Sequence, residues 1–539
     1  MRYRSQAVAT VMMAGTLVVL LPTPAQAATY CVGDPVCEGG TPMATLAAAV
    51  AAADASPGPD TVLIAPGVYE TPLQACNGLF VTEADTWVRG SGIGSTVLTT
   101  PDLPGDAGYT RSVICGHMHL SDLTLRLASA VTTGNASLQG FDLYSGRIER
   151  VRIDAVGATF GPGSNDGRGE AGLVREGIVR DLEVDLDPDQ DTEGLNFLNS
   201  GPVLMERIRV RSRVRALGGR VAQAPGIAPT VVRHARLESS YPMRVSSNSG
   251  HDGELRLSDA VVICRTTDVC TGVGVADGIP SQAATLTMDR VTIIGNGHSG
   301  SAALEVYGQG GAAPTTLHAR HVVAHGFPTT LHLGHFGGPA SAYISHSNLD
   351  LSPGRVIIEG ASSPGAVTSF GPGNRAGAPR LRNPAGGDYR LTSTSPGVDI
   401  GGADLIQGGP TDLAGTRRPL DGNGDGSAVN DAGAFEHRRP APRIKVVGVK
   451  RRPSAGTAVL VVRVSDAGRV VLRGKQVRKS VTGASRPKKV RLTVRARGQA
   501  LEQLRSTGSV RIRPVVRLLP RAEGVKPVQL KPRVRLVLR

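Results

Sequence analysis

The densest group of acidic side chains lies in DLEVDLDPDQDTE, residues 181–193. In an extended strand every second side chain points the same way, so Asp185 and Asp187 would share one face and could hold a hard cation such as calcium. Arg180 and Arg207 belong to neighbouring copies of a sequence repeat and could act beside that cation. A solvated acidic loop accounts for the same composition, and we favour it over a catalytic site.

A second candidate for calcium lies in DGNGDG, where three oxygen-bearing side chains alternate ahead of Gly426: Asp421, Asn423 and Asp425. This order matches the start of an Asp-x-Asn-x-Asp-Gly calcium loop, in which alternating ligands surround a tight turn. The twelfth position is Ala432 rather than glutamate, so a bidentate ligand would have to come from Asp431 or Glu436. The sequence therefore predicts a variant calcium site, and a glycine-rich turn without metal is the alternative.

A hexapeptide occurs in nine copies along the chain, and two of the copies contain Arg180 and Arg207. It begins as LSDLTL at Leu120, and the later copies, spaced 25 to 31 residues apart, read IERVRI, VRDLEV, MERIRV, VRHARL, LSDAVV, MDRVTI, ARHVVA and ISHSNL. The first, fourth and sixth positions are mostly apolar, and the third is Asp, Arg or His. One apolar face of this size cannot be buried alone, but stacked copies bury it against one another, which predicts a solenoid.

The polar third position of the repeat predicts a corner between two short strands. Six of the twelve histidines lie between His318 and His346, which raises the possibility of a metal site. His321 and His346, however, occupy the third position in place of Asp or Arg, as His234 does. A side chain at a tight corner can satisfy nearby backbone groups, so we expect this column to be structural.

The segments between the copies argue against helical returns, because stretches such as SNSGHDGEL and GNGHSGSAALEV are too rich in Gly, Ser and Asn. A second short strand follows many copies, at 194–197, 243–245, 303–306 and 330–333. From about residue 41 to residue 370 the chain resembles right-handed parallel β-helix proteins of the pectin-lyase-like superfamily. We therefore expect an all-β, three-sided coil within residues 28–387, capped by an N-terminal helix over residues 43–54.

The N-terminus has the three parts of a secretory signal: a positive MRYR, an apolar stretch at 7–21 and a small-residue cleavage pattern in PTPAQA. We expect residues 1–27 to be removed, and the mature chain to be extracellular, associated with the cell surface and without a transmembrane segment.

Six cysteines in an exported chain should pair. The expected disulfides are Cys31–Cys37, Cys264–Cys270 and, from the two that remain, Cys76–Cys115.

The last hundred residues differ in charge from the rest of the chain. Residues 440–539 contain 27 Lys or Arg and 3 Asp or Glu, a net charge of +24, against −9 for residues 1–439. Apolar and basic residues alternate along 490–497 and 533–539, which predicts strands of a basic β-sandwich over 445–539. Its outward arginines would bind anionic surface polymers: Arg491, Arg495, Arg497, Arg533 and Arg535. Without aromatic residues to stack on bases, nucleic acid is not expected, and a merely solubilising face is the alternative.

Between the solenoid and the basic tail, residues 388–437 pair DYRLTSTSPGVDIGG with TDLAGTRRPLDGNGDGSAVNDAGAFEH, and RRPAPR begins a linker over 438–444. The pairing resembles the choice-of-anchor Q segment that ends many bacterial β-helix proteins. The matching residues are Ser395, Pro396, Asp399, Gly401, Arg418, Pro419, Asp431, Gly433, Ala434, Phe435 and Glu436. This resemblance implies a link to the cell surface, although no sorting motif follows.

Three functions fit this organisation. The superfamily resemblance implies polysaccharide substrates, handled by calcium-assisted β-elimination or by hydrolysis between paired carboxylates. The hydrolase signatures Asn-Thr-Asp, Asp-Asp and Gly-His-Gly do not occur in order, and the lyase motifs are missing. We therefore expect a secreted monomer that binds extracellular or cell-wall polysaccharide without an assembled catalytic motif. A polysaccharide lyase or glycoside hydrolase is the first alternative, and a structural spacer that displays the cationic domain is the second.

Overall fold

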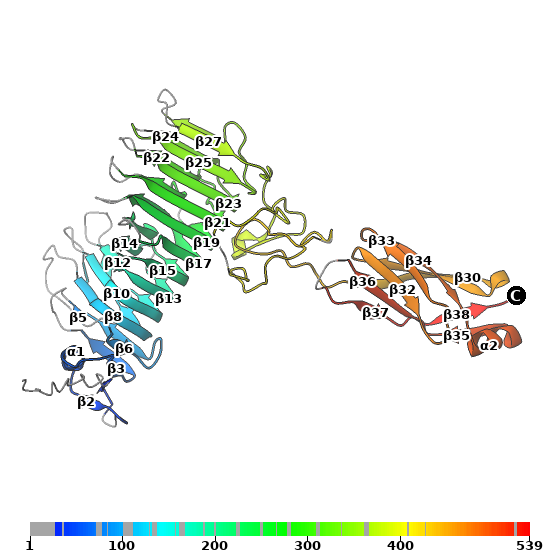
Figure 1. The fold of residues 1–539 in the computed structure, drawn as a ribbon, viewed down its shortest axis with the longest axis horizontal. Helices are drawn as coiled ribbons and strands as arrows, with labels where there is room; N and C mark the ends of the chain where they lie inside the picture. Colours follow the sequence, from blue (N-terminus) through cyan, green and yellow to red (C-terminus); the bar gives the residue numbers. More distant parts are fainter. Residues whose placement is uncertain are drawn as a thin grey trace, which may run out of the picture.

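The computed structural model shows a parallel β-solenoid, a segment packed along its side and a small C-terminal β-sandwich (Figure 1). It describes residues 27–539 apart from 35–36, 72–77, 83–84, 101–110, 129, 132–136, 157, 161–167, 187–188, 199–200, 222–226, 248–251, 266, 277–281, 309–312, 336, 360–365, 407–408, 426 and 522–524. The predicted signal sequence thus lies outside the described residues, except for residue 27. Within the described part of the chain, no helix is long and apolar enough to cross a membrane.

Three walls of parallel strands, called A, B and C, form the solenoid that the repeat predicted. Wall A contains β5 (Leu79–Val81), the first parts of β8 (Arg111–Arg126) and β10 (Ser137–Asp154), β12 (Arg168–Val174), β14 (Thr192–Leu198), β16 (Arg215–Val221), β18 (Met243–Ser247), β20 (Thr271–Ala276), β22 (Ala302–Gly308), β24 (Thr329–His335) and β26 (Val356–Glu359). Four of these, β14, β18, β22 and β24, are the predicted second strands.

Wall B begins with β1 (Thr29–Val32), β2 (Thr41–Met43), β3 (Thr61–Ile64) and β6 (Trp87–Arg89) and ends with β25 (Ala340–Ser345) and β27 (Ala366–Phe370). Wall C begins with β4 (Gly67–Glu70) and β7 (Thr96–Thr99). Between these ends, single bent strands serve both walls: the later parts of β8 and β10, then β13 (Gly177–Asp185), β15 (Val203–Arg211), β17 (Thr230–Ser239), β19 (Gly253–Cys264), β21 (Ala284–Ile294) and β23 (Thr315–His325). A separate short pair joins β9 (Ala130–Val131) and β11 (Thr159–Phe160).

The bend between walls B and C lies at the polar third position of every repeat. All nine corner residues have a left-handed backbone, with φ between 48° and 60°: Asp122, Arg150, Asp181, Arg207, His234, Asp259, Arg290, His321 and His346. Asp and His tolerate this conformation better than most residues. Each corner arginine instead forms a bidentate pair with the aspartate one coil earlier, as Arg150 does with Asp122 at 2.6 and 2.8 Å. The structural role predicted for this column is confirmed.

The structure tests the predicted N-terminal helix and the predicted disulfides of the solenoid. Helix α1 (Leu46–Ala55) follows an N-cap at Thr45 and buries Leu46 and Val50 against the solenoid core, as expected of a cap. Two predicted disulfides, Cys31–Cys37 and Cys264–Cys270, are present. Cys115 is also disulfide-bonded, but its predicted partner Cys76 lies outside the described residues.

After β27 the chain returns along wall C, where β28 (Leu381–Asn383) and β29 (Asp388–Leu391) pair, joined by a 3-10 turn (Pro384–Gly386). Residues 388–437, here called the docking segment, appear in yellow in Figure 1. Outward positions of wall C are charged in early coils, as at Arg152, and apolar in later coils, where Val261, Ile294 and Val323 lie. Tyr389 packs against Val261 and Ile294, so the repeat loses its outward charges where the docking segment covers it.

The C-terminal domain is built from antiparallel sheets around an aliphatic core, which confirms the predicted β fold. Its strands are β30 (Ile444–Arg452), β31 (Thr457–Val464), β32 (Gly468–Arg473), β33 (Ser480–Ala484), β34 (Lys488–Arg495), β35 (Ser509–Ile512), β36 (Val515–Pro520), β37 (Val528–Leu530) and β38 (Val534–Val537), with a 3-10 turn at Pro453–Ala455. Helix α2 (Gln499–Thr507) was not predicted. Val447 and Val449 are exposed among the basic residues, so the outward face is less uniformly basic than expected.

Candidate functional site

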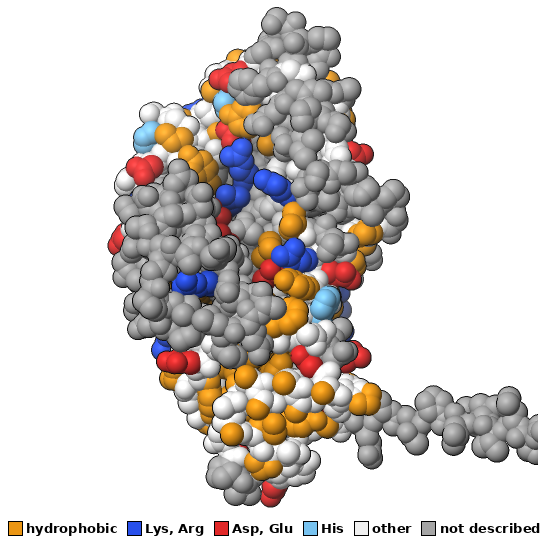
Figure 2. Space-filling model, turned by 90° about the vertical axis from the view of Figure 1, so that its left-hand side faces the viewer, with side chains coloured by type: hydrophobic (Ala, Val, Ile, Leu, Met, Phe, Trp, Pro, Cys, Tyr) orange, Lys and Arg blue, Asp and Glu red, His pale blue; other side chains and the backbone are white. Residues whose placement is uncertain are grey.

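Wall A carries a cluster of ionisable side chains on its outer face. In β22, Leu304 and Val306 are buried in the solenoid, so Glu305 and Tyr307 alternate with them and point outward. The parallel register places His332 of β24 beside Glu305. Figure 2 looks onto the side of the molecule where β12, β14, β22 and β24 are labelled in Figure 1, and it shows Lys and Arg side chains gathered near the middle of this face.

Hydrogen bonds and one ion pair join residues from four successive coils into what we call the wall A cluster. The Oη atom of Tyr307 donates to Oε1 of Glu305 at 2.8 Å and lies 3.1 Å from Nδ1 of His332. Thr271 donates from Oγ1 to Oε2 of Glu305 at 3.2 Å. On the far side, Nε2 of His332 lies 3.3 Å from Oε1 of Glu359. His332 and Glu305 keep 17% and 21% of their side-chain surface exposed, although Nε2 of His332 is itself buried.

The electrostatics of the cluster favour recognition over proton abstraction. The hydrogen bond to Glu305 raises the pKa of His332, which favours the imidazolium. Burial, and then the bond to Glu305, raises the pKa of Tyr307 and keeps the phenol protonated. Burial alone would raise the pKa of Glu305, but the hydrogen bonds from His332, Tyr307 and Thr271 outweigh it and the pKa is lowered. The cluster therefore offers a cationic donor, a hydroxyl and carboxylate acceptors.

Outward polar residues continue along wall A toward the N-terminus. Ser112 donates to Gln139 at 3.3 Å, and Gln139 donates to Glu170 at 2.7 Å, across three coils. Arg215 contacts Glu193 at 3.2 Å, again between neighbouring coils. We call these residues, with exposed Arg244 and the wall A cluster, the wall A track: Gln139, Glu170, Glu193, Arg215, Arg244, Glu305, Tyr307, His332 and Glu359. The members lie in neighbouring coils about 4.8 Å apart, but Gln139 and Glu193 are only 6% and 5% exposed, so the part of the track that a ligand can reach lies mainly at Arg244 and the wall A cluster.

Sequence reasoning found two of the four strands that carry the wall A cluster, β22 and β24, but not β20 or β26, and it did not single out the residues of the cluster. The alternation in ALEVYG and TLHLGH was sufficient to put Glu305, Tyr307 and His332 on outer positions. The 27 residues between Glu305 and His332 are close to one repeat, which was a further signal.

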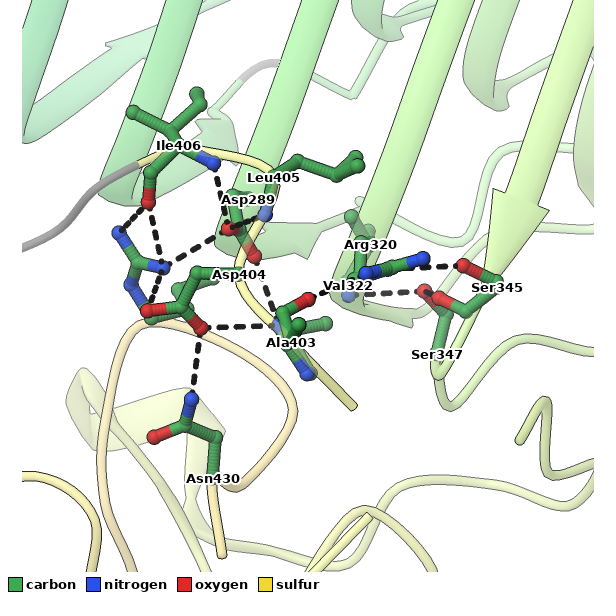
Figure 3. A network of polar contacts seen from close by, with 12 residues as sticks. Asp289, Arg320, Val322, Ser345, Ser347, Ala403, Asp404, Leu405, Ile406 and Asn430 are labelled. Carbon is green, nitrogen blue, oxygen red and sulfur yellow. Dashed lines mark hydrogen bonds and ion pairs between the residues drawn. The ribbon is translucent and has the colours of Figure 1, made fainter. Parts of the chain in front are cut away.

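A second cluster, the corner clamp, lies where the docking segment meets the corner of walls B and C (Figure 3). Oδ2 of Asp289 accepts the backbone N–H groups of Leu405 and Ile406 at 2.7 and 3.1 Å. Arg290, 1% exposed, donates to Asp289 and makes a bidentate pair with Asp259 at 2.9 and 3.1 Å. These contacts fasten the loop around Leu405 to the solenoid.

The corner clamp also has the spacing of a metal centre, since ligand atoms of Asp289, His321 and Asp404 all lie within 4.8 Å of one another. Each ring nitrogen of His321, however, already faces an oxygen: Nδ1 lies 2.8 Å from Oδ1 of Asp289, and Nε2 lies 2.6 Å from the carbonyl oxygen of Gly401. Both oxygens of Asp289 are also used. The group is therefore saturated by contacts within the chain, and we interpret it as a structural clamp rather than a metal site.

Buried carboxylates organise the docking segment itself. Asp399 accepts the backbone N–H groups of Gly422 and Asn423, and Asp431 accepts those of Asp399 and His437. Burial raises the pKa of Asp399 to about 6. Burial, followed by the charge of Asp431, raises the pKa of Glu436 to about 9. These residues belong to the motif that resembles choice-of-anchor Q, and their contacts fold the segment.

The predicted calcium loop keeps its turn geometry. Asn423 and Asp425 accept the backbone N–H groups of Asp425 and Ser427 at 2.7 and 2.8 Å, and Asp421 accepts that of Gly424. Asp431 fits poorly as the missing bidentate ligand, because both its oxygens hold backbone N–H groups. Gly426 lies outside the described residues, and calcium in this loop stays a prediction.

The residues predicted from the acidic stretch lie in ion pairs along the solenoid. Arg207 is bidentate to Asp181 at 2.6 and 2.8 Å, and Arg180 pairs with Glu206 at 3.1 Å. Asp185 lies 3.3 Å from Arg211. Asp187 is outside the described residues. Both candidate arginines are thus held against carboxylates other than Asp185, and a catalytic role for this set stays a prediction.

The five arginines predicted to bind anionic partners are all exposed, but they do not share one sheet. Arg491 and Arg495 alternate with buried Leu492 and Val494 on β34. Arg535 lies on β38, opposite Arg511 of β35. Anion binding by the tail stays a prediction, spread over more than one surface of the domain.

The solenoid is similar to two solved structures, both A-modules of mannuronan C-5 epimerases from Azotobacter vinelandii. The AlgE6 module is 14% identical, with a TM-score of 0.36, over 62% of this chain and 95% of its own. The AlgE4 module is 13% identical, with a TM-score of 0.31, over 62% and 93%. No protein-family model matches the chain, and no curated protein is similar to it. At these identities and TM-scores the likeness adds nothing to the description of the solenoid, which rests on the strand pairing itself.

Proposed function

We propose that the chain is an exported protein that binds an extracellular or cell-wall polysaccharide along wall A. The wall A cluster carries this proposal, because its side chains are partly exposed and its phenol and carboxylates can exchange hydrogen bonds with sugar hydroxyl groups. The docking segment packs on wall C and at its corner, away from these residues. Two disulfides suit an oxidising compartment. The cationic domain would hold the protein on anionic polymers through its +24 charge.

A polysaccharide lyase is the second candidate, because Tyr307 and His332 lie in hydrogen-bonding contact and could move a proton at a bound sugar. Abstraction of a proton would need one of them in its basic form. Hydrogen bonding to Glu305 favours charged His332, and the raised pKa of Tyr307 keeps the phenol protonated. Binding is therefore the function we favour over elimination.

The test is a screen of residues 28–539 against polysaccharides, followed by variants of the cluster. Tyr307→Phe combined with His332→Gln should weaken binding by about tenfold, the effect of losing one or two hydrogen bonds to a ligand. His318 and Tyr343 form a stacked pair on wall B, with ring centroids 5.0 Å apart, and provide the matched control. His318→Gln with Tyr343→Phe should leave binding unchanged. Equal losses in both double variants would contradict the proposal, and an unsaturated product absorbing at about 235 nm would favour the lyase.

A further inference from the structure

The only tryptophan of the chain, Trp87, lies on the outer face of wall B near the capped end of the solenoid. Val88 is buried in the core, so Trp87 and Arg89 point outward from β6. The indole stacks on His119, one coil later, with ring centroids 4.6 Å apart and planes inclined by 25°. On the other side its neighbour in register is the small Thr61. His119 thus packs on one face of the indole. The other face lies toward Thr61, whose side chain is too small to cover it.

A hollow of about 350 Å³ opens at this place, lined by Thr61, Trp87, Arg89, Ser121, Glu149 and Arg150. The side chains of Arg89 and Arg150 are 57% and 48% exposed. The carboxylates of Asp122 and Glu149 are only 20% and 18% exposed and pair with these arginines. The more exposed charges that line the hollow are therefore the two guanidinium groups, beside the indole, while the less exposed Glu149 also lines it.

We propose that this hollow is a second saccharide subsite, which takes one acidic sugar residue of the uronate class. A sugar ring has an apolar face that can pack on the indole, and indole is suited to surfaces that are partly apolar and partly wet. The carboxylate of a uronate would receive hydrogen bonds from Arg89, whose planar guanidinium group can bind a carboxylate with two donors. Nε and Nη2 of Arg150 already donate to Asp122, so Arg150 would add its positive charge. The subsite rests on the proposed polysaccharide function, but it lies on another wall and would hold a separate stretch of the polymer.

Because the chain has one tryptophan, its fluorescence reports on this hollow alone among the candidate sites. Residues 28–539 would be titrated with hexagalacturonate, with hexamannuronate and with the neutral cellohexaose. We expect a saturable change of emission with at least one uronate oligomer and none with cellohexaose. Arg89→Gln with Arg150→Gln should weaken the response by about tenfold. Arg126→Gln, which breaks a comparable pair with Asp154 on wall C, is the matched control and should not change it.

Four outcomes would overturn the subsite. Binding of uronate polymer to the chain without any change of emission would refute it and leave the wall A proposal standing. Loss of the emission change in the Tyr307→Phe, His332→Gln double variant would show that the signal comes from wall A. A response to cellohexaose equal to that for both uronates would refute the acidic class. If no polysaccharide binds in any assay, the subsite and the proposed function both fail.

Discussion

The corner clamp and the wall A cluster are built from the same types of residue and differ in what lies over them. In the clamp, Asp289, Arg290 and His321 are at most 1% exposed, and backbone groups of the docking segment take up their hydrogen bonds. In the wall A cluster, His332 and Glu359 keep 17% and 50% of their side-chain surface exposed, and they pair with each other and with wall A residues rather than with a covering segment. A histidine beside a carboxylate therefore stabilises the fold in the corner clamp and forms a candidate recognition site in the wall A cluster. The two clusters differ in whether the docking segment covers them, not in the types of residue that they contain.

The largest effect should come from breaking the clamp. Arg290→Met removes the charge between two buried carboxylates, Asp259 and Asp289, and leaves them uncompensated. We expect a loss of roughly 3–5 kcal/mol in the free energy of unfolding, measured by chemical denaturation.

The control for this change is Arg150→Met at an equivalent corner. Arg150 has a similar backbone, with φ of 54° against 59° for Arg290, but it is 48% exposed. Exposed ion pairs contribute about 0–1 kcal/mol, so the loss should be small. Similar losses at both corners would show that backbone geometry, and not the covered ion pairs, determines stability.

A smaller effect is expected from pH acting on the docking segment. Glu436 has a pKa of about 9 in the folded chain against an ordinary 4.5, and Asp399 has about 6 against 3.8. Above pH 4.5 the unfolded chain releases a proton that folded Glu436 retains, so stability is lost as pH rises from about 4.5 to 9. Glu436→Gln should remove most of this loss above pH 6. Denaturation midpoints at pH 5, 7 and 9 measure it, and a variant that follows the wild-type slope would refute the assignment.

The weakest effect per residue is expected on the cationic domain. Replacing Arg491, Arg495, Arg497, Arg533 and Arg535 by Gln should reduce retention on an anionic polymer several-fold and lower its salt dependence, because exposed charges are screened over about 8 Å at physiological ionic strength. The matched variant with five lysines keeps the charge and should keep binding. If the glutamine variant binds as well as the parent chain, the charge serves solubility and the domain does not anchor the protein.

The solenoid was readable from sequence because each repeat carries the same local constraint. A polar residue between apolar positions, as at Asp122 or His321, marks a corner, and stacked corners fix the walls. The sequence contains a partial signal that wall C is covered, because the apolar Val261 and Val323 occupy outward positions that are charged in earlier coils. The sequence did not show which segment covers these residues. Asp289 contacts Leu405 across a separation of 116 residues, and no repeat relates the two positions. Helix α2 was missed although Gly498 and Gly508 bound it, since the flanking strands dominated the pattern.

The most direct test of the account is hydroxyl-radical footprinting of residues 28–539 with and without the polysaccharide that binds best. Tyr307 and His332 on wall A should be protected by the ligand. Tyr343 and His318, the same residue types on wall B of the same two coils, should react equally in both samples. Protection of both pairs, or of the wall B pair alone, would contradict the claim that the polysaccharide lies along wall A.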